Sequence, residues 1–170
     1  GTMQMCNANS TAGVELNTAQ PMAGAKSLRI LFDFGNETTA WQQWTFYAIP
    51  LVGVPRDLSS YAGVRVTLRS NQARAVRFDI DSPNNSAAMK GIQAGWDLSV
   101  STEPKLFEVR FAEAKPPSWA ADPGDSLAAI LQTVTGLRFQ PICNGRTLAG
   151  QLPEGTRDNG WLDVDDLTFF

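Results

Sequence analysis

The sequence predicts an all-β protein, a β-sandwich jelly roll of two antiparallel sheets with about eight strands. Three observations support this fold class. Short segments alternate apolar and polar residues, turns rich in Gly, Pro and Asn separate them, and no long stretch has helical apolar spacing. Alternation with a period of two is typical of strands that bury one face. The clearest case is 62–82, where two such runs flank the polar segment Ser70–Arg74.

The elements follow in order along a chain that we expect to be one domain, 1–170. Its first part, 1–24, is polar and interrupted by Gly13 and Pro21, which predicts an extended N-terminal arm with at most one short strand. The expected strands are Ser27–Phe34, Trp44–Leu51, Gly63–Ser70, Ala75–Ser82, Gly91–Leu98, Lys105–Phe111, Gly136–Ile142 and Trp161–Phe170. One helical turn is expected within Ser126–Thr133.

Jelly-roll order places alternate strands in opposite sheets. One sheet would then hold Trp44–Leu51, Gly136–Ile142, Ala75–Ser82 and Gly91–Leu98, and the other sheet would hold the remaining four. This sorting gathers Arg77, Asp79, Arg138 and Gln140 on the first sheet. Such a row of polar side chains is typical of a sugar-binding surface and equally of an ordinary solvated sheet face.

The last strand changes its alternation in the middle. Leu162 and Val164 share one parity, whereas Leu167 and Phe169 share the other, so a β-bulge at Asp165-Asp166 would return both pairs to the core. The bulge would also turn a carboxylate in an unusual direction. Asp165 is therefore a candidate ligand for a structural calcium ion, although a bulge without a ligand explains the pattern too.

Composition excludes several classes of function. The net charge of −3 without a basic run argues against a nucleic-acid partner, and no apolar stretch approaches the ~20 residues that span a membrane. Histidine is absent, which excludes Ser-His-Asp and Cys-His triads and histidine-ligated metal sites. We expect a monomer without an organic cofactor.

The two cysteines, Cys6 and Cys143, are too far apart in sequence for a CxxC motif. They are either two inert buried thiols or one disulfide that fixes the N-terminal segment to a late strand. We favour the disulfide, which implies a secreted, extracellular protein.

Sugar recognition needs an apolar plate for the C–H face of a pyranose and planar polar groups for its hydroxyls. The polar groups would be Arg77, Asp79, Arg138 and Gln140, and the candidate plates are Trp41, Trp44, Tyr47 and Trp96. Trp44 and Tyr47 have opposite parity, so both can face one groove only if the strand twists or bulges.

A hydrolase of polysaccharides needs two carboxylates around the scissile bond. Asp79 and Asp81 share a strand face about 7 Å apart, a separation that does not exclude an inverting pair. Arg77, however, is expected to lower the pKa of Asp79, which is wrong for a general acid. We therefore expect a protein that is not an enzyme.

Several segments together resemble a known family. These are DLSSYAGVRVTLRSN, AVRFDIDSP, KLFEVRFAEAKPPSWA, VTGLRFQP and GWLDVDDLTFF, which span Arg56 to Phe170. They resemble the galactose-binding-like jelly rolls among carbohydrate-binding modules, in particular the family 11-like group near families 4 and 22.

The resemblance implies a module that binds a plant cell-wall polysaccharide in a groove across the concave sheet. It implies a β-glucan-type ligand (cellulose, mixed-linkage glucan or xyloglucan) and an attached glycoside hydrolase. The groove positions match Arg77, Asp79, Arg138 and Gln140, and Asp165 matches a structural calcium position. The chain departs from the family in tyrosines, which commonly line such grooves, because it has only Tyr47 and Tyr61.

Two further functions compete with this reading. A structural or protein-interaction domain on the same fold predicts that the aromatic residues are buried and the sheet face is closed. A polysaccharide-active enzyme predicts an isolated carboxyl group with a raised pKa.

Overall fold

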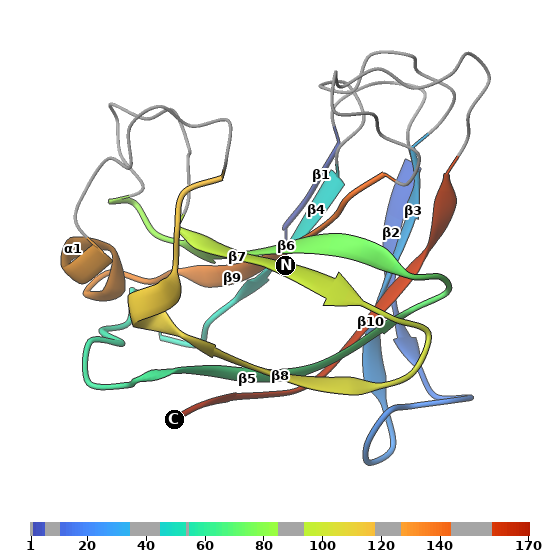
Figure 1. Ribbon diagram of the computed structural model, residues 1–170, viewed down its shortest axis with the longest axis horizontal. Coiled ribbons are helices and arrows are strands. Elements are labelled where there is room, and N and C mark those ends of the chain that lie inside the picture. The colour runs from blue at the N-terminus through green and yellow to red at the C-terminus, as the bar shows by residue number, and fades with distance from the viewer. Residues whose placement is uncertain are drawn as a thin grey trace.

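The computed structural model describes residues 2–5, 11–34, 45–53, 55–84, 94–117, 127–143 and 158–170. They form two antiparallel sheets of five strands that pack against each other (Figure 1). Sheet A has the order β1 (Thr2–Met5), β4 (Thr45–Pro50), β9 (Gly136–Pro141), β6 (Arg74–Asp81) and β7 (Gly95–Val100). Sheet B has the order β2 (Thr11–Asn17), β3 (Ser27–Asp33), β10 (Asn159–Phe169), β5 (Gly63–Ser70) and β8 (Lys105–Arg110).

This arrangement confirms the jelly-roll sandwich and the predicted division of strands between the sheets. One expectation was wrong, because the segment 1–24 contributes β1 to sheet A and β2 to sheet B. A sequence with weak alternation forms a strand when it hydrogen-bonds to the edge of an existing sheet, as both of these segments do. The described helices are short: α1 (Leu127–Leu131) lies where a helical turn was predicted, and η2 (Phe111–Glu113) is a 3₁₀ turn. None of the described helices is long and apolar enough to cross a membrane.

The core lies between the sheets and is built from the apolar parity of each strand. In sheet A, Phe78 of β6 stacks on Phe139 of β9 with ring centroids 4.6 Å apart, and both side chains are fully buried. The inward residues of sheet B that meet them include Ile30, Val66 and Leu162, also fully buried. Residues of the opposite parity therefore face outward on each sheet, and these outward faces carry the polar side chains.

The predicted bulge in the last strand is confirmed. The pairing of β10 with β5 shifts between Asp165 and Thr168, and Asp166 has a positive φ of 50°. The extra residue changes the parity, so Leu167 and Phe169 pack against the core as Leu162 does. The bulge thus reconciles an interrupted alternation with a continuous buried face.

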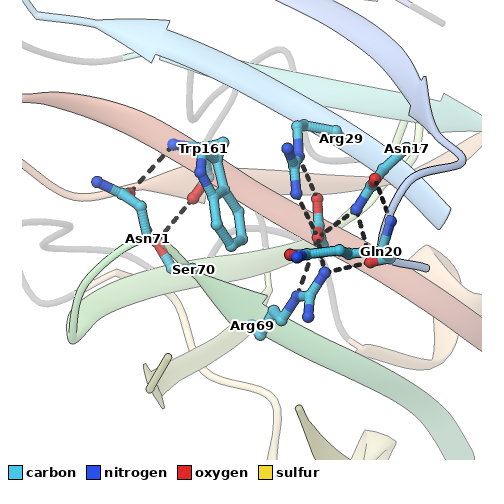
Figure 2. Close-up of polar contacts among 8 residues, drawn as sticks. Asn17, Gln20, Arg29, Arg69, Ser70, Asn71 and Trp161 are labelled. Atoms are coloured by element: carbon cyan, nitrogen blue, oxygen red, sulfur yellow. Dashed lines mark hydrogen bonds and ion pairs between the residues drawn. The ribbon is translucent and has the colours of Figure 1, made fainter. Parts of the chain in front are cut away.

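A buried carboxylate fastens the outer face of sheet B. Asp163 of β10, fully buried, accepts hydrogen bonds from Arg29 Nε at 2.7 Å, Arg69 Nη2 at 2.9 Å and Asn17 Nδ2 at 3.0 Å. Figure 2 shows these side chains converging from β2, β3 and β5, together with the Gln20 carbonyl that accepts from Asn17 and Arg69. Asp163 thus joins four strands, and Asn17 and Arg69 bind the connection from β2 to β3 to the same network.

The surroundings of Asp163 set its protonation. Burial alone would raise the pKa of Asp163, but the hydrogen bonds from Arg29, Arg69 and Asn17 and the charge of Arg29 hold it below the usual range. A carboxylate with a lowered folded-state pKa stabilises the fold above the unfolded-state pKa of about 4. This stabilisation is lost as the pH falls through the folded-state pKa.

We predict that Asp163→Asn lowers the free energy of unfolding at pH 7 by roughly 3 kcal/mol, because both arginines lose their buried partner. The matched control is Glu108→Gln, which breaks the exposed pair with Arg65 at 2.9 Å and is expected to cost less than about 1 kcal/mol. Denaturant unfolding at pH 7 and at acid pH measures both. The difference between wild type and Asp163→Asn is expected to shrink below about pH 4, and a difference independent of pH would contradict this account.

Candidate functional site

The outer face of sheet A brings together the four predicted polar residues. Asp79 of β6 lies directly across from Arg138 of β9, and Arg77 lies across from Gln140 in the same ladder. The alternation of β6 and β9 buries Phe78 and Phe139 in the core and turns these four side chains the other way. Adjacent strands of one sheet thus give the cluster a fixed geometry.

The centre of the cluster is the Asp79 carboxylate. Its Oδ1 accepts a hydrogen bond from Arg77 Nε at 2.7 Å, and its Oδ2 accepts one from Arg138 Nη2 at 3.2 Å. Only 2% of Asp79 and 5% of Arg77 is exposed. Arg138 is half-buried, so its side chain is more open to solvent than those of Asp79 and Arg77.

The segment around Lys115 covers Arg77 at the β7 edge of sheet A. Lys115 and Gly95 exchange backbone hydrogen bonds of 2.9 and 3.0 Å, and the Lys115 carbonyl accepts a hydrogen bond from Arg77 Nη2. A side chain at Gly95 would collide with the Phe78 carbonyl and the Asp79 carboxylate, so only glycine fits there. Arg77 also lies 3.4 Å from the largely exposed carboxylate of Asp97.

The pKa of Asp79 differs from the sequence-based expectation. Burial raises the pKa of Asp79 above its usual range, although the charges and hydrogen bonds of Arg77 and Arg138 act in the opposite direction. A raised pKa is what a general acid needs, but both oxygens of this carboxylate already bind guanidinium groups beneath the surface. The geometry does not present Asp79 to a glycosidic bond.

Phe46 of β4 is a site residue that the sequence analysis missed. The guanidinium carbon of Arg138 lies 4.4 Å from the centroid of the Phe46 ring, a cation–π contact on the outer face. Phe46 is half-buried and shares its parity with Ala48, which pairs with Arg138. The same parity rule that was applied to Trp44 and Tyr47 would have found it.

The structure corrects two of the predicted aromatic plates. Tyr47 and Trp96 are 8% and 7% exposed and belong to the core, because they lie across from Phe139 and Phe78. Trp96 packs against Phe78 with ring centroids 5.3 Å apart, and its Nε1 donates to the Arg110 carbonyl at 3.1 Å. Neither ring can lie flat against a sugar on the outer face. Trp41 and Trp44 are outside the described residues.

Asp165, the predicted calcium ligand, binds backbone donors at the bulge, and the calcium site itself stays a prediction. Its Oδ2 accepts the Ala23 N–H and its Oδ1 accepts the Asp166 N–H, each at 2.9 Å. Across the described segments, no group of three or more acidic or cysteine side chains converges on a point. The carboxylate acts as a cap for backbone donors at the bulge.

The predicted disulfide remains a prediction. Cys143, which follows β9, is buried with 3% of its surface exposed. Cys6 lies outside the described residues.

Comparisons with known proteins show which folds this one shares. No family model matches the sequence, and no curated protein matches it. Among solved structures, a family 11 carbohydrate-binding module from Clostridium thermocellum in complex with a β-1,3-1,4-mixed-linked tetrasaccharide aligns with a TM-score of 0.59 at 13% identity, over 96% of this chain and 84% of that one.

Two further structures extend the comparison. The family 30 carbohydrate-binding module of the cellulosomal cellulase Cel9D-Cel44B of Clostridium thermocellum aligns with a TM-score of 0.55 at 14% identity, over 92% of this chain and 81% of that one. An exo-β-agarase structure aligns with a TM-score of 0.55 at 11% identity, over 99% of this chain but only 23% of that one. This chain therefore has the jelly-roll fold of the family 11 and family 30 carbohydrate-binding modules.

Proposed function

We propose that this protein is a non-catalytic module that binds a polysaccharide through the outer face of sheet A. The observation that carries the proposal is the pair formed by Arg138 and Phe46 beside Gln140. An aromatic ring offers an apolar plate to the C–H face of a pyranose. The guanidinium and the amide offer planar hydrogen-bonding groups for neighbouring hydroxyls.

Arg77 and Asp79 serve this site as positioning residues. They are too deeply buried to contact a sugar, but Asp79 fixes the guanidinium of Arg138, and Arg77 fixes Asp79. A guanidinium that is held before the ligand arrives loses less conformational entropy on binding. The role of these two residues thus differs from the direct contact that the resemblance implied.

The proposed ligand is a neutral β-glucan, such as mixed-linkage glucan, xyloglucan or cellulose. The charge of Arg138 is balanced by Asp79, and the exposed carboxylate of Asp97 near Arg77 would repel an acidic polymer. A family 11 module with this fold was solved with a mixed-linkage tetrasaccharide, which supports the same ligand class at the level of the fold.

We also propose that the module is secreted and attached to a glycoside hydrolase. The exo-β-agarase comparison supports this arrangement, because a chain of this fold accounts for 23% of that larger structure. The Cys6–Cys143 disulfide would suit an extracellular location.

A protein-interaction or structural domain is the second candidate. It is favoured by one observation, the burial of Tyr47, Trp96, Arg77 and Asp79, which leaves Phe46 as the described aromatic side chain facing outward on sheet A. The same fold carries unrelated functions, so the fold alone does not separate the two candidates.

We predict that native electrophoresis in gels containing mixed-linkage β-glucan, xyloglucan or soluble cellulose derivatives retards the wild-type protein. Arg138→Ala and Phe46→Ala are each expected to weaken this retardation by about tenfold or more, because each removes one part of the contact surface. The matched control is Arg65→Ala, which removes an arginine 4.5 Å from the Phe170 ring on sheet B and is expected to leave retardation unchanged.

Two outcomes would count against this assignment. Unchanged retardation of both variants would show that the binding site does not lie on the outer face of sheet A. No retardation of the wild-type protein in any neutral or acidic polysaccharide gel would favour the protein-interaction domain.

We further predict that Asp79→Asn weakens binding and also lowers the free energy of unfolding by roughly 3 kcal/mol, because Arg77 and Arg138 lose their shared buried partner. Arg138→Lys keeps the charge but not the planar fork, so it is expected to weaken binding with little loss of stability. Paired titration and denaturant unfolding measure both effects. Wild-type affinity in Asp79→Asn would show that Arg138 needs no positioning.

A further inference from the structure

The outer face of sheet B has an ordered pattern of side chains beyond the Asp163 cluster. The registers of β2, β3 and β10 place their outward residues in three rows across the strands. The rows are polar (Thr11, Asp33, Asn159), then largely apolar (Gly13, Leu31, Trp161), then charged (Glu15, Arg29, Asp163). A sugar ring can pack its C–H face on an apolar surface while its hydroxyls bond neighbouring polar groups.

A hollow of about 450 Å³ lies over the first row and over Gly13 and Leu31 of the second. Its described lining residues include Thr11, Gly13, Leu31, Asp33, Asn159 and Gly160. The absence of a side chain at Gly13 helps to open it, since an added Cβ would meet only Leu31, at 3.8 Å. The volume lies within the range of about 300–1,000 Å³ that small-molecule sites occupy.

Trp161, which follows the lining residue Gly160 in the sequence, is held in place. The guanidinium carbons of Arg29 and Arg69 lie 4.1 and 5.5 Å from the centroid of its ring, and Figure 2 shows the ring beside these side chains. The backbone N–H of Trp161 donates to Asn71 Oδ1 at 3.1 Å, which fixes the start of β10. Since Asp163 binds both arginines, these arginines hold the Trp161 ring of the apolar row in a fixed position.

We propose that this hollow is a second saccharide site, which binds one neutral pyranose unit on the face of the sandwich opposite to the Arg138 site. Leu31 forms the apolar floor. The Thr11 hydroxyl, the Asp33 carboxylate and the Asn159 amide supply donors and acceptors for the sugar hydroxyls. The described lining residues include one carboxylate and no cation, which selects against acidic sugars.

The inference goes beyond the proposed function, because the two sites share no residue and lie on different sheets. The pyranose unit can belong to a free monosaccharide or to a longer chain. The two probes are therefore methyl β-D-glucopyranoside and cellotetraose, titrated separately into the ¹⁵N-labelled protein and followed by amide NMR shifts.

We expect saturable shifts of the Gly13, Leu31 and Gly160 amides with dissociation constants on the order of 1 mM for a contact of this size. Gly13→Val fills the hollow and is expected to raise these dissociation constants by about tenfold or more, since the added side chain occupies the ligand volume. Leu31→Ala, which removes the apolar floor, provides a second variant. Tighter binding of cellotetraose than of the monosaccharide identifies a chain as the ligand.

Two controls separate this site from the first one. Thr67→Val changes the same outer face at a position across from Asp165, outside the hollow, and is expected to leave the shifts unchanged. Arg138→Ala removes the sheet A site and is also expected to leave them unchanged. The proposal is overturned if neither probe gives saturable shifts at these amides, or if the shifts persist with wild-type constants in Gly13→Val and Leu31→Ala.

Discussion

The pairing of one buried carboxylate with two guanidinium groups is the constraint on which both outer faces of this sandwich depend. Asp163 binds Arg29 and Arg69 on sheet B, and Asp79 binds Arg77 and Arg138 on sheet A. A charge that is removed from water destabilises a fold unless its partners are close and well oriented. Each network therefore fixes the strand register around it, and the neighbouring outward side chains take their positions from that register.

The two networks differ in what they leave for a ligand. Hydrogen bonds hold the pKa of Asp163 low and join the network to the turn after β2, so its groups serve the fold. Burial instead raises the pKa of Asp79, and its second arginine lies over the Phe46 ring near the surface. An arginine that is fixed by a buried carboxylate and partly open to solvent beside an aromatic ring is suited to recognise a sugar. The role proposed for Arg138 rests on this difference.

Alternation in the sequence was enough to predict eight strands and the bulge at Asp165-Asp166, because each depends on which residues must be buried. The division of the strands between the sheets came from jelly-roll order. At most one of the two strands of 1–24 was expected, because sheet edges recruit such strands through backbone hydrogen bonds, which leave little sequence signal. The polar residues of the site were found by parity, whereas Tyr47 and Trp96 were misplaced. Aromatic residues suit a core as well as a binding surface, and only their cross-strand partners distinguish the two.

The central claim is that a sugar lies against Phe46 and Arg138 on the outer face of sheet A. The most direct test is to measure intermolecular nuclear Overhauser effects between the protein and a bound mixed-linkage β-glucan tetrasaccharide. The account predicts contacts from the Phe46 ring protons to the C–H face of one glucose unit, with Gln140 nearby. Saturable binding without any contact to Phe46 would contradict it.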